Sequence, residues 1–176
     1  ENIDPNLTPL NYNLAAEDQQ LPQVDFIHKR MSEIRVQKRA DVNVLCDWVI
    51  TQPKELPADR SRDFFESVYA FMRDRYGKRN VISAYVHMDE TTPHAHWGAV
   101  PIKDGRLSWK AFFDGRGGLS AFQDRCFEKV GKPWGLDRGE KHSGRRYRET
   151  AEMKRDLEQE VEELREQKAA LIDEIA

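Results

Sequence analysis

The sequence contains only two cysteines, Cys46 and Cys126, and they lie far apart. Two isolated thiols without a CxxC pair cannot supply the disulfide framework of a small secreted domain or a cysteine-based zinc site. We therefore predict that both are reduced thiols, with Cys46 on the buried face of a strand.

Long hydrophobic runs are also missing. No apolar stretch approaches the roughly 18 residues that a membrane-spanning helix needs, and the first residues lack the basic-then-apolar pattern of a signal peptide. These absences predict a cytoplasmic protein. The 176 residues, 39% of them hydrophobic, are enough for one cored domain with an appendage.

The chain carries little net charge, and the formal value of −3 is not what a nucleic-acid-binding protein usually shows. The charge is unevenly distributed, however. Residues 151–176 hold nine acids and four bases, whereas residues 102–148 hold twelve bases and six acids. A basic segment on a nearly neutral body suits a phosphate-bearing partner, although an ordinary solvated surface explains this signal equally well.

Hydrophobic spacing predicts a mixture of helices and strands. Apolar residues at helical spacing indicate helices, and alternating ones indicate strands, with "KDG" as a hairpin turn before the last strand. Helices are predicted over residues 24–34, 58–77 and 117–131, and strands over residues 41–51, 80–88, 94–102 and 106–113.

From residue 151 onward the pattern becomes a heptad repeat. Leu157, Val161, Leu164, Leu171 and Ile175 fall on a and d positions, which predicts a coiled coil or a long solvated helix. A lone helix and an arm that forms a homodimer are both compatible with this pattern.

Three of the five histidines lie within ten positions, in "HMDETTPHAH" at residues 87–96. His94 and His96 are two apart, so on a strand they project from the same face, while Trp97 faces the other way. If "DETTP" connects two antiparallel strands, His87 lies opposite His94 or His96, and the three imidazoles can converge on one ion. Three neutral imidazoles leave coordination positions open, which is the pattern of a catalytic metal site.

Two carboxylates, Asp89 and Glu90, lie beside the histidines. A carboxylate in this position can orient an imidazole N–H or take a proton from a nucleophile. Asp89 is equally well explained as a cap of the turn. The spacing alone does not name a reaction, because such sites serve hydrolases, oxygenases and nucleases.

The decapeptide resembles the histidine-triad motif HxDExTPHxH of the MobV (Mob/Pre) family of plasmid mobilisation relaxases. The resemblance extends over residues 2–149. "IDPNLTPLNYNL" is similar to an early DPSRxHLNYxL stretch of the family, "VLCDWVIT" to a VLCDEWIIT-like strand, "DGRLSWKAFF" to the segment after the triad, and "WGLDRGE" with His142 to a GLxRG…KH element.

This resemblance implies an α+β fold of the HUH-endonuclease type, in which helices flank an antiparallel β-sheet and the histidines lie on its open face. It assigns residues 1–149 to a relaxase-like nuclease domain and residues 150–176 to the start of a C-terminal coiled-coil helix.

The resemblance also implies the chemistry. His87, His94 and His96 would hold Mn²⁺ or Mg²⁺, and Glu90 would be the functional carboxylate. The ion would polarise the scissile phosphate of single-stranded or hairpin DNA at a plasmid transfer origin. The implied enzyme is a relaxase that nicks and rejoins this DNA through a covalent 5′-phosphate intermediate and thereby initiates conjugative mobilisation.

Two departures from the family pattern concern the nucleophile. The family's nucleophile is taken to be a histidine in an HNxR motif before the IDP stretch, and the sequence has no such motif, because "IHKR" with His28 lies in the wrong place. We therefore expect the domain to lack its first strand here and the nucleophile to lie upstream of Glu1. In addition, Pro9 replaces the histidine of HLNY, which makes Tyr12 a candidate substitute nucleophile, although a packed tyrosine is the commoner outcome.

DNA binding requires cations for phosphates and flat groups for bases. Three basic clusters and one tryptophan are candidates, with packing favoured for Trp109 because Leu107 and Ala111 share its face in the predicted strand. The candidates are Arg35, Lys38, Arg39, Arg106, Trp109, Lys110, Arg116, Arg138, Lys141, Arg145 and Arg146.

Two other functions stay open at this point. One is a DNA-binding or dimerising regulator in which the histidines hold a structural ion, and the other is an unrelated metallohydrolase that acts on small molecules. The open three-ligand set argues against the first, and the basic segment argues against the second.

Overall fold

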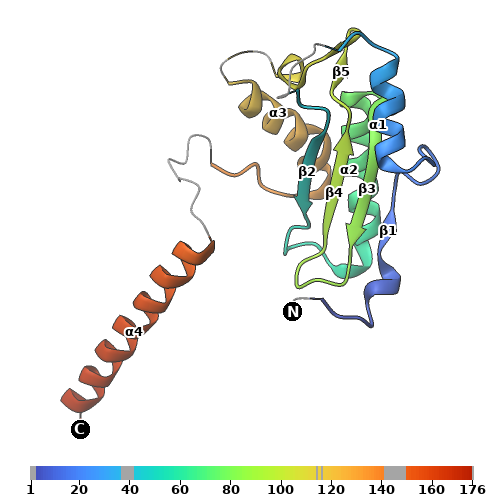
Figure 1. Cartoon of the computed structure of the whole chain (residues 1–176). Helices are drawn as coiled ribbons and strands as arrows, with labels where there is room; N and C mark the ends of the chain where they lie inside the picture. Colours follow the sequence, from blue (N-terminus) through green and yellow to red (C-terminus); the bar gives the residue numbers. More distant parts are fainter. Residues whose placement is uncertain (1–2, 37–41, 114, 116, 141–149, 176) are drawn as a thin grey trace. The chain divides into compact units, whose positions relative to one another are not determined.

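The computed structural model describes residues 3–36, 42–113, 115, 117–140 and 150–175. The chain divides into two compact units, Glu1–Gly139 and Glu140–Ala176. The first unit contains the β-sheet with helices α1 to α3, and the second contains the long helix α4 (Figure 1).

An antiparallel four-stranded sheet organises the first unit, with the strand order β1-β3-β4-β2. Two further short strands, β5 and β6, pair with each other beyond the end of β4. The bounds of the strands are Tyr12–Asn13 (β1), Cys46–Thr51 (β2), Val81–His87 (β3), His94–Ala99 (β4), Ile102–Lys103 (β5) and Arg106–Leu107 (β6).

One face of the sheet is buried beneath α2 (Ser61–Tyr76) and α3 (Gly118–Cys126). Phe64, Val68 and Met72, which lie at helical spacing on one side of α2, are buried against the strands. The helix ends at Gly77, whose φ of 84° lies in the region that suits glycine. On the strand side, the side chains of Ala95 and Trp97 complete this core.

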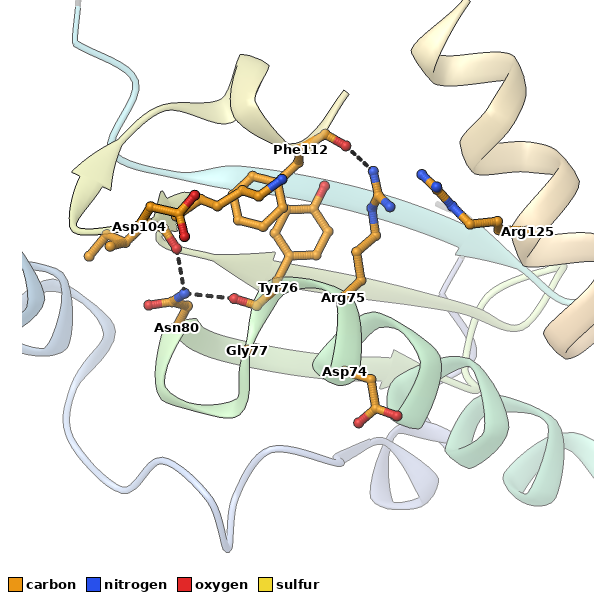
Figure 2. A pocket seen from close by; sticks show the side chains of 10 residues that line it. Asp74, Arg75, Tyr76, Gly77, Asn80, Asp104, Phe112 and Arg125 are labelled. Carbon is orange, nitrogen blue, oxygen red and sulfur yellow. Dashed lines mark hydrogen bonds between the residues drawn. The ribbon is translucent and has the colours of Figure 1, made fainter. Parts of the chain in front are cut away.

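Helix α1 (Gln23–Ser32) covers a smaller apolar cluster, in which Phe26 and Ile27 pack against Ile82 and its neighbours. Asn80 joins the elements at this end of the sheet. Its side-chain amide donates to the carbonyl oxygens of Tyr76 (2.6 Å) and Ile102 (2.9 Å), and its Oδ1 accepts from Arg30 (2.8 Å). Figure 2 shows the two donated bonds.

The prediction of a strand over residues 106–113 is wrong beyond Leu107. Only Arg106–Leu107 pairs, and Trp109–Phe112 forms a 3₁₀ turn. The turn directs Trp109 and Phe113 onto Trp48, with ring centroids 6.4 and 6.2 Å from that of Trp48. Because both rings pack on Trp48, the segment does not show the alternation of side chains between two faces that an extended strand would have.

Two other differences concern the predicted strands. A register shift between Val81 and Ser83 interrupts the regular alternation of the predicted strand over residues 80–88, and Val81 lies in the core. Strand β2 begins at Cys46, whereas the prediction began this strand at residue 41. Cys46 is a buried free thiol, as predicted. Strand β1 has no counterpart among the predictions, because two residues are too short to show a period.

The second unit contains helix α4, Thr150–Ile175, as the heptads predicted. Its described apolar side chains are exposed, with relative accessibilities of 60% for Leu157, 39% for Val161 and 57% for Leu164. Among the helices of the described residues, none is long and apolar enough to span a bilayer.

Candidate metal centre

The structure brings His87, His94 and His96 together on the sheet face that α2 and α3 leave open. His87 lies directly opposite His94 across β3 and β4, and His96 is two residues further along β4. The intervening Ala95 and Trp97 are buried on the other face, so the core fixes the direction in which the histidines point.

The spacing of the three rings fits a shared ion. The ring centroids are 5.2 Å apart for His87 and His94, 5.5 Å for His87 and His96, and 5.3 Å for His94 and His96. Three imidazoles bound tetrahedrally at about 2.1 Å from one ion have ring centres about 5 Å apart.

The orientation of the rings differs from that of a completed site. His87 and His94 are stacked at an interplanar angle of 14°, whereas ligands of one ion point toward a common centre. In these rotamers the described residues contain no group of three or more His, Cys, Asp or Glu side chains that could hold a metal ion. The spacing of the three rings therefore fits a shared metal ion. To bind one, the rings must rotate about their side-chain bonds.

Each Nδ1 atom of the triad faces an oxygen. Nδ1 of His94 lies 3.0 Å from the carbonyl oxygen of Thr92, and a carbonyl can only accept, so the contact selects the tautomer of the neutral ring in which Nδ1 carries the proton and Nε2 the lone pair. Nδ1 of His87 is 4.0 Å from Asp89, and Nδ1 of His96 is 3.7 Å from Asp47. These two distances exceed a hydrogen bond, but small rotations close them. The arrangement favours Nε2 as the ligating atom of all three histidines.

Asp89 is held by the N-terminal segment. It is 5% exposed, and its Oδ2 accepts a hydrogen bond of 2.8 Å from the hydroxyl of Thr8. This bond is the main cause that lowers the pKa of Asp89, so the group is a carboxylate at neutral pH. Its other oxygen, Oδ1, is buried with no hydrogen-bond partner among the described residues and faces His87. Asp89 thus lies both in the turn and beside an imidazole, the two positions that its alternative predicted roles require.

Glu90 lies on the ligand side of the triad. Its Oε1 is 3.9 Å from Nε2 of His94, the nitrogen that is free to bind an ion. Its backbone forms a bridge with Ile3, so the position of this carboxylate is also tied to the N-terminal segment. A carboxylate in this position can bind an ion or accept a proton from a group beside it.

Sequence reasoning missed Asp47, which lies on β2 outside the decapeptide. Its neighbour Trp48 faces the core, so Asp47 faces the open side, and β2 pairs with β4 so that the Asp47 carboxylate reaches His96. The alternation in "CDWVIT" indicates that Asp47 lies on the sheet face opposite to Trp48. Nothing in the sequence indicates which strand pairs with β2.

Replacement of Asp47 by asparagine is expected to weaken Mn²⁺ binding about tenfold, because a neutral amide then replaces the charged carboxylate beside the His96 imidazole, and changes at such orienting partners have effects of this order. Isothermal titration calorimetry measures the affinity. Asp63→Asn, an exposed carboxylate at the start of α2, is the matched control and should bind Mn²⁺ like the original protein. Equal affinities in the two variants would contradict a role for Asp47.

The sequence profile of the plasmid recombination enzyme family (Mob_Pre) matches residues 1–155. The chain belongs to this family. Among its relatives, the plasmid recombination enzyme of Streptococcus agalactiae is 36% identical over 165 residues, which are 88% of this chain and 33% of the relative. That of Bacillus thuringiensis is 38% identical over 173 residues, 92% of this chain and 38% of the relative. The chain thus spans between a third and two fifths of the length of these relatives.

Solved structures of a MobM relaxase domain, assigned to MOBV and Mob_Pre, have the same fold as this Mob_Pre chain. One, bound to Mn and a 22-nucleotide plasmid pMV158 oriT DNA with a 3′-thiophosphate, is 33% identical, with a TM-score of 0.75 over 89% of this chain and 84% of that one. Another, bound to Mn and a 23-nucleotide oriT DNA, is 31% identical, with a TM-score of 0.76 over 89% and 85%. The predicted α+β fold and the predicted family are both confirmed.

The Mob_Pre chain places Tyr12 away from the triad. Tyr12 pairs with Val86, a core residue, so its ring lies on the helix-covered face beneath the guanidinium of Arg62. Burial raises the pKa of Tyr12, which disfavours the phenolate. The position of Tyr12 argues against a role as substitute nucleophile and agrees with the alternative of a packed tyrosine.

The predicted DNA contacts of this Mob_Pre domain fall into three groups. Arg35, Arg106 and Lys110 are exposed, but β5 and β6 lie beyond the end of β4, away from His94 at its start. Arg138 forms an ion pair of 2.7 Å with Asp124, and Trp109 packs on Phe113, so both side chains already have partners within the domain. The other candidates lie outside the described residues: Lys38, Arg39, Arg116, Lys141, Arg145 and Arg146.

A pocket of about 430 Å³ at the end of α2 also contains cations. Figure 2 shows Arg75 donating to the carbonyl oxygen of Phe112. Lys103 donates to the carbonyl oxygen of Ala111 at 2.7 Å, and Asp74 and Asp104 line the same pocket. Arg75 and Lys103 thus hold the 3₁₀ turn in place, and the triad is the better candidate for the chemistry of this Mob_Pre chain.

Proposed function

We propose that this protein is a metal-dependent relaxase that nicks and rejoins single-stranded or hairpin DNA at a plasmid transfer origin and so initiates conjugative mobilisation. The observation that carries the proposal is the histidine triad on the open sheet face, with Nδ1 of each ring facing an oxygen and Nε2 favoured as the ligand. The MobM relaxase domain with this fold, bound to oriT DNA and Mn, supports both the substrate and the ion.

His87, His94 and His96 would hold one Mn²⁺ or Mg²⁺ through their Nε2 atoms. A divalent ion in this place polarises the phosphodiester and stabilises charge on its non-bridging oxygens. Three protein ligands leave coordination positions for the phosphate oxygens. The open face of the sheet gives a DNA strand access to these positions, because His87 and His96 are partly exposed.

Glu90 takes the role of the functional carboxylate in this proposal. Its Oε1 lies beside Nε2 of His94, so a group attacking a phosphate held at the triad comes within its reach. There the carboxylate accepts the proton that the nucleophile loses as its bond to phosphorus forms. As the nucleophile bonds to the 5′ phosphate, the bond from phosphorus to the 3′ oxygen breaks, and this oxygen takes up a proton and leaves as the 3′ hydroxyl. The hydroxyl later attacks the same phosphorus and reverses the step. The identity of the nucleophile is no part of the proposal, because Tyr12 lies on the other face.

The protein would act in the cytoplasm and would hold the DNA strand partly through exposed cations. Plasmid DNA is processed in the cytoplasm, so we place the reaction there. The exposed cations Arg35, Arg106 and Lys110 would bind phosphates further along the strand, a salt-dependent contribution that carries no sequence information.

A strand-transfer assay tests the proposal. The full-length protein is incubated with a 5′- or 3′-labelled strand of the transfer origin of its plasmid, with Mn²⁺ or with EDTA, and resolved on a denaturing gel before and after protease. A Mn²⁺-dependent, protease-sensitive DNA–protein adduct is the expected result. Gel retardation without an adduct would favour the regulator with a structural ion, and the absence of both would favour a hydrolase of small molecules.

We also propose that α4 pairs with α4 of a second copy. Leu157, Val161 and Leu164 form an exposed apolar stripe at heptad spacing, which a coiled coil would bury. Sedimentation equilibrium should give a dimer for the full chain and a monomer for the double variant Leu157→Lys, Leu164→Lys. Gln159→Lys, off the stripe on the same helix, should remain a dimer. A monomeric original chain at micromolar concentration would refute the pairing.

A further inference from the structure

We propose that Tyr85 is a stacking platform for one nucleobase of the DNA strand, next to the phosphate that the histidine triad binds. The proposal rests on the function proposed above and adds to it a residue outside the histidine motif. Its occupant is a base of single-stranded DNA, which has an exposed π-face that a base in a duplex does not.

The position of Tyr85 carries the inference. Tyr85 lies on β3 directly opposite His96 on β4, and it precedes His87 by two residues, so its ring rises from the same face as the triad. Directly opposed side chains in an antiparallel pair have Cβ atoms about 5 Å apart. A strand whose phosphate lies over the histidines therefore brings a neighbouring nucleotide over Tyr85.

The environment of Tyr85 differs from that of the other described tyrosines. Its relative accessibility is 44%, whereas Tyr69 and Tyr76 are at 8% and 2%, and Tyr12 packs against the core. Tyr69 and Tyr76 also use their hydroxyls in hydrogen bonds. Within the described residues, no hydrogen-bond partner, aromatic ring or cation contacts Tyr85. A large flat ring thus stands uncovered beside the metal centre.

Val49 supports the same placement of the DNA. It lies opposite His96 on the other neighbouring strand, β2, and its relative accessibility is 58%. Two exposed apolar side chains therefore flank His96 across the sheet, in a row that runs from Val49 through His96 to Tyr85. An apolar surface beside a cation site matches a nucleotide, which presents a charged phosphate and a flat base, better than it matches a small polar substrate.

The test uses oligonucleotides in which 2-aminopurine replaces the base on the 5′ or the 3′ side of the nick, after the nick has been mapped by primer extension. Stacking on tyrosine quenches 2-aminopurine fluorescence. The original protein and Tyr85→Phe should quench the probe at one of the two positions. Tyr85→Ala should lose this quenching and bind the strand about tenfold more weakly, the fold-change expected for one lost base–aromatic stack.

The controls separate stacking from damage to the fold or to the metal centre. Val24→Ala, which removes an exposed apolar side chain from α1, should bind and quench like the original protein. Mn²⁺ affinity measured by calorimetry should be the same for Tyr85→Ala and the original protein. If the original protein cleaves the strand but Tyr85→Ala quenches the probe and binds the strand as well as the original protein does, the role of Tyr85 is refuted and the proposed function is not. An original protein that neither binds nor cleaves the strand would overturn the proposed function together with it.

Discussion

Replacing His94 by alanine is expected to lower Mn²⁺ affinity by more than about 100-fold, since the loss of a group that merely orients a ligand already costs 10- to 100-fold. Of the three proposed ligands, His94 has the tautomer that is fixed most firmly, by the 3.0 Å contact of Nδ1 with the carbonyl oxygen of Thr92. Adduct formation with origin DNA should fall below detection, because the phosphate then lacks its electrostatic partner.

Calorimetry with Mn²⁺ and circular dichroism check this prediction together. The fold should be retained, since the His94 side chain projects from the open face and the core lies on the other side of the sheet. His28→Ala, on the surface helix α1, is the matched control and should change neither signal. Mn²⁺ binding by His94→Ala with undiminished affinity would exclude His94 as a ligand.

Replacing Trp97 by alanine is expected to destabilise the protein by about 3–5 kcal/mol, the usual cost of deleting a large buried aromatic side chain. Trp97 is 1% exposed and its ring centroid lies 5.0 Å from that of Tyr76 on α2. Because His94 and His96 lie on the same strand as Trp97, part of the metal site should be lost with the packing of this strand.

Urea denaturation monitored by circular dichroism measures the change. Trp97→Phe is the matched control and should cost clearly less, because it keeps most of the apolar volume. It also removes the Trp97 Nε1 donor, which is buried without a hydrogen-bond partner among the described residues. If the alanine variant unfolded at the same urea concentration as the original protein, β4 would not depend on this side chain for its packing.

The strands that carry the histidines could be predicted from the sequence because their alternation is regular. In "HAHWGA" the core-facing residues Ala95, Trp97 and Ala99 alternate with the two histidines and Gly98, and a short polar segment such as "DETTP" suits a connection between antiparallel strands. The pairing of His87 with His94 was one of two registers left open, and the structure selects it.

The contribution of Asp47 could not be predicted, because it depends on the order of the strands. β2 pairs with β4 and not with β3, and a period-2 pattern contains no information about which strand is the neighbour. The strand prediction for the segment after Leu107 was wrong for another reason. Its aromatic residues satisfy a strand pattern, but their packing on Trp48 requires a turn, and tertiary contacts override local preference in such segments.

The N-terminal segment has a consequence for how the protein acquires its chemistry. Contacts from Ile3, Asp4 and Thr8 hold the turn with Asp89 and Glu90, and the Thr8–Asp89 bond joins residues 81 positions apart. Pairs so distant along a chain form slowly, because a large loop must close first. The contacts that hold the two acidic groups should therefore form late during refolding, after the hairpin of β3 and β4 exists.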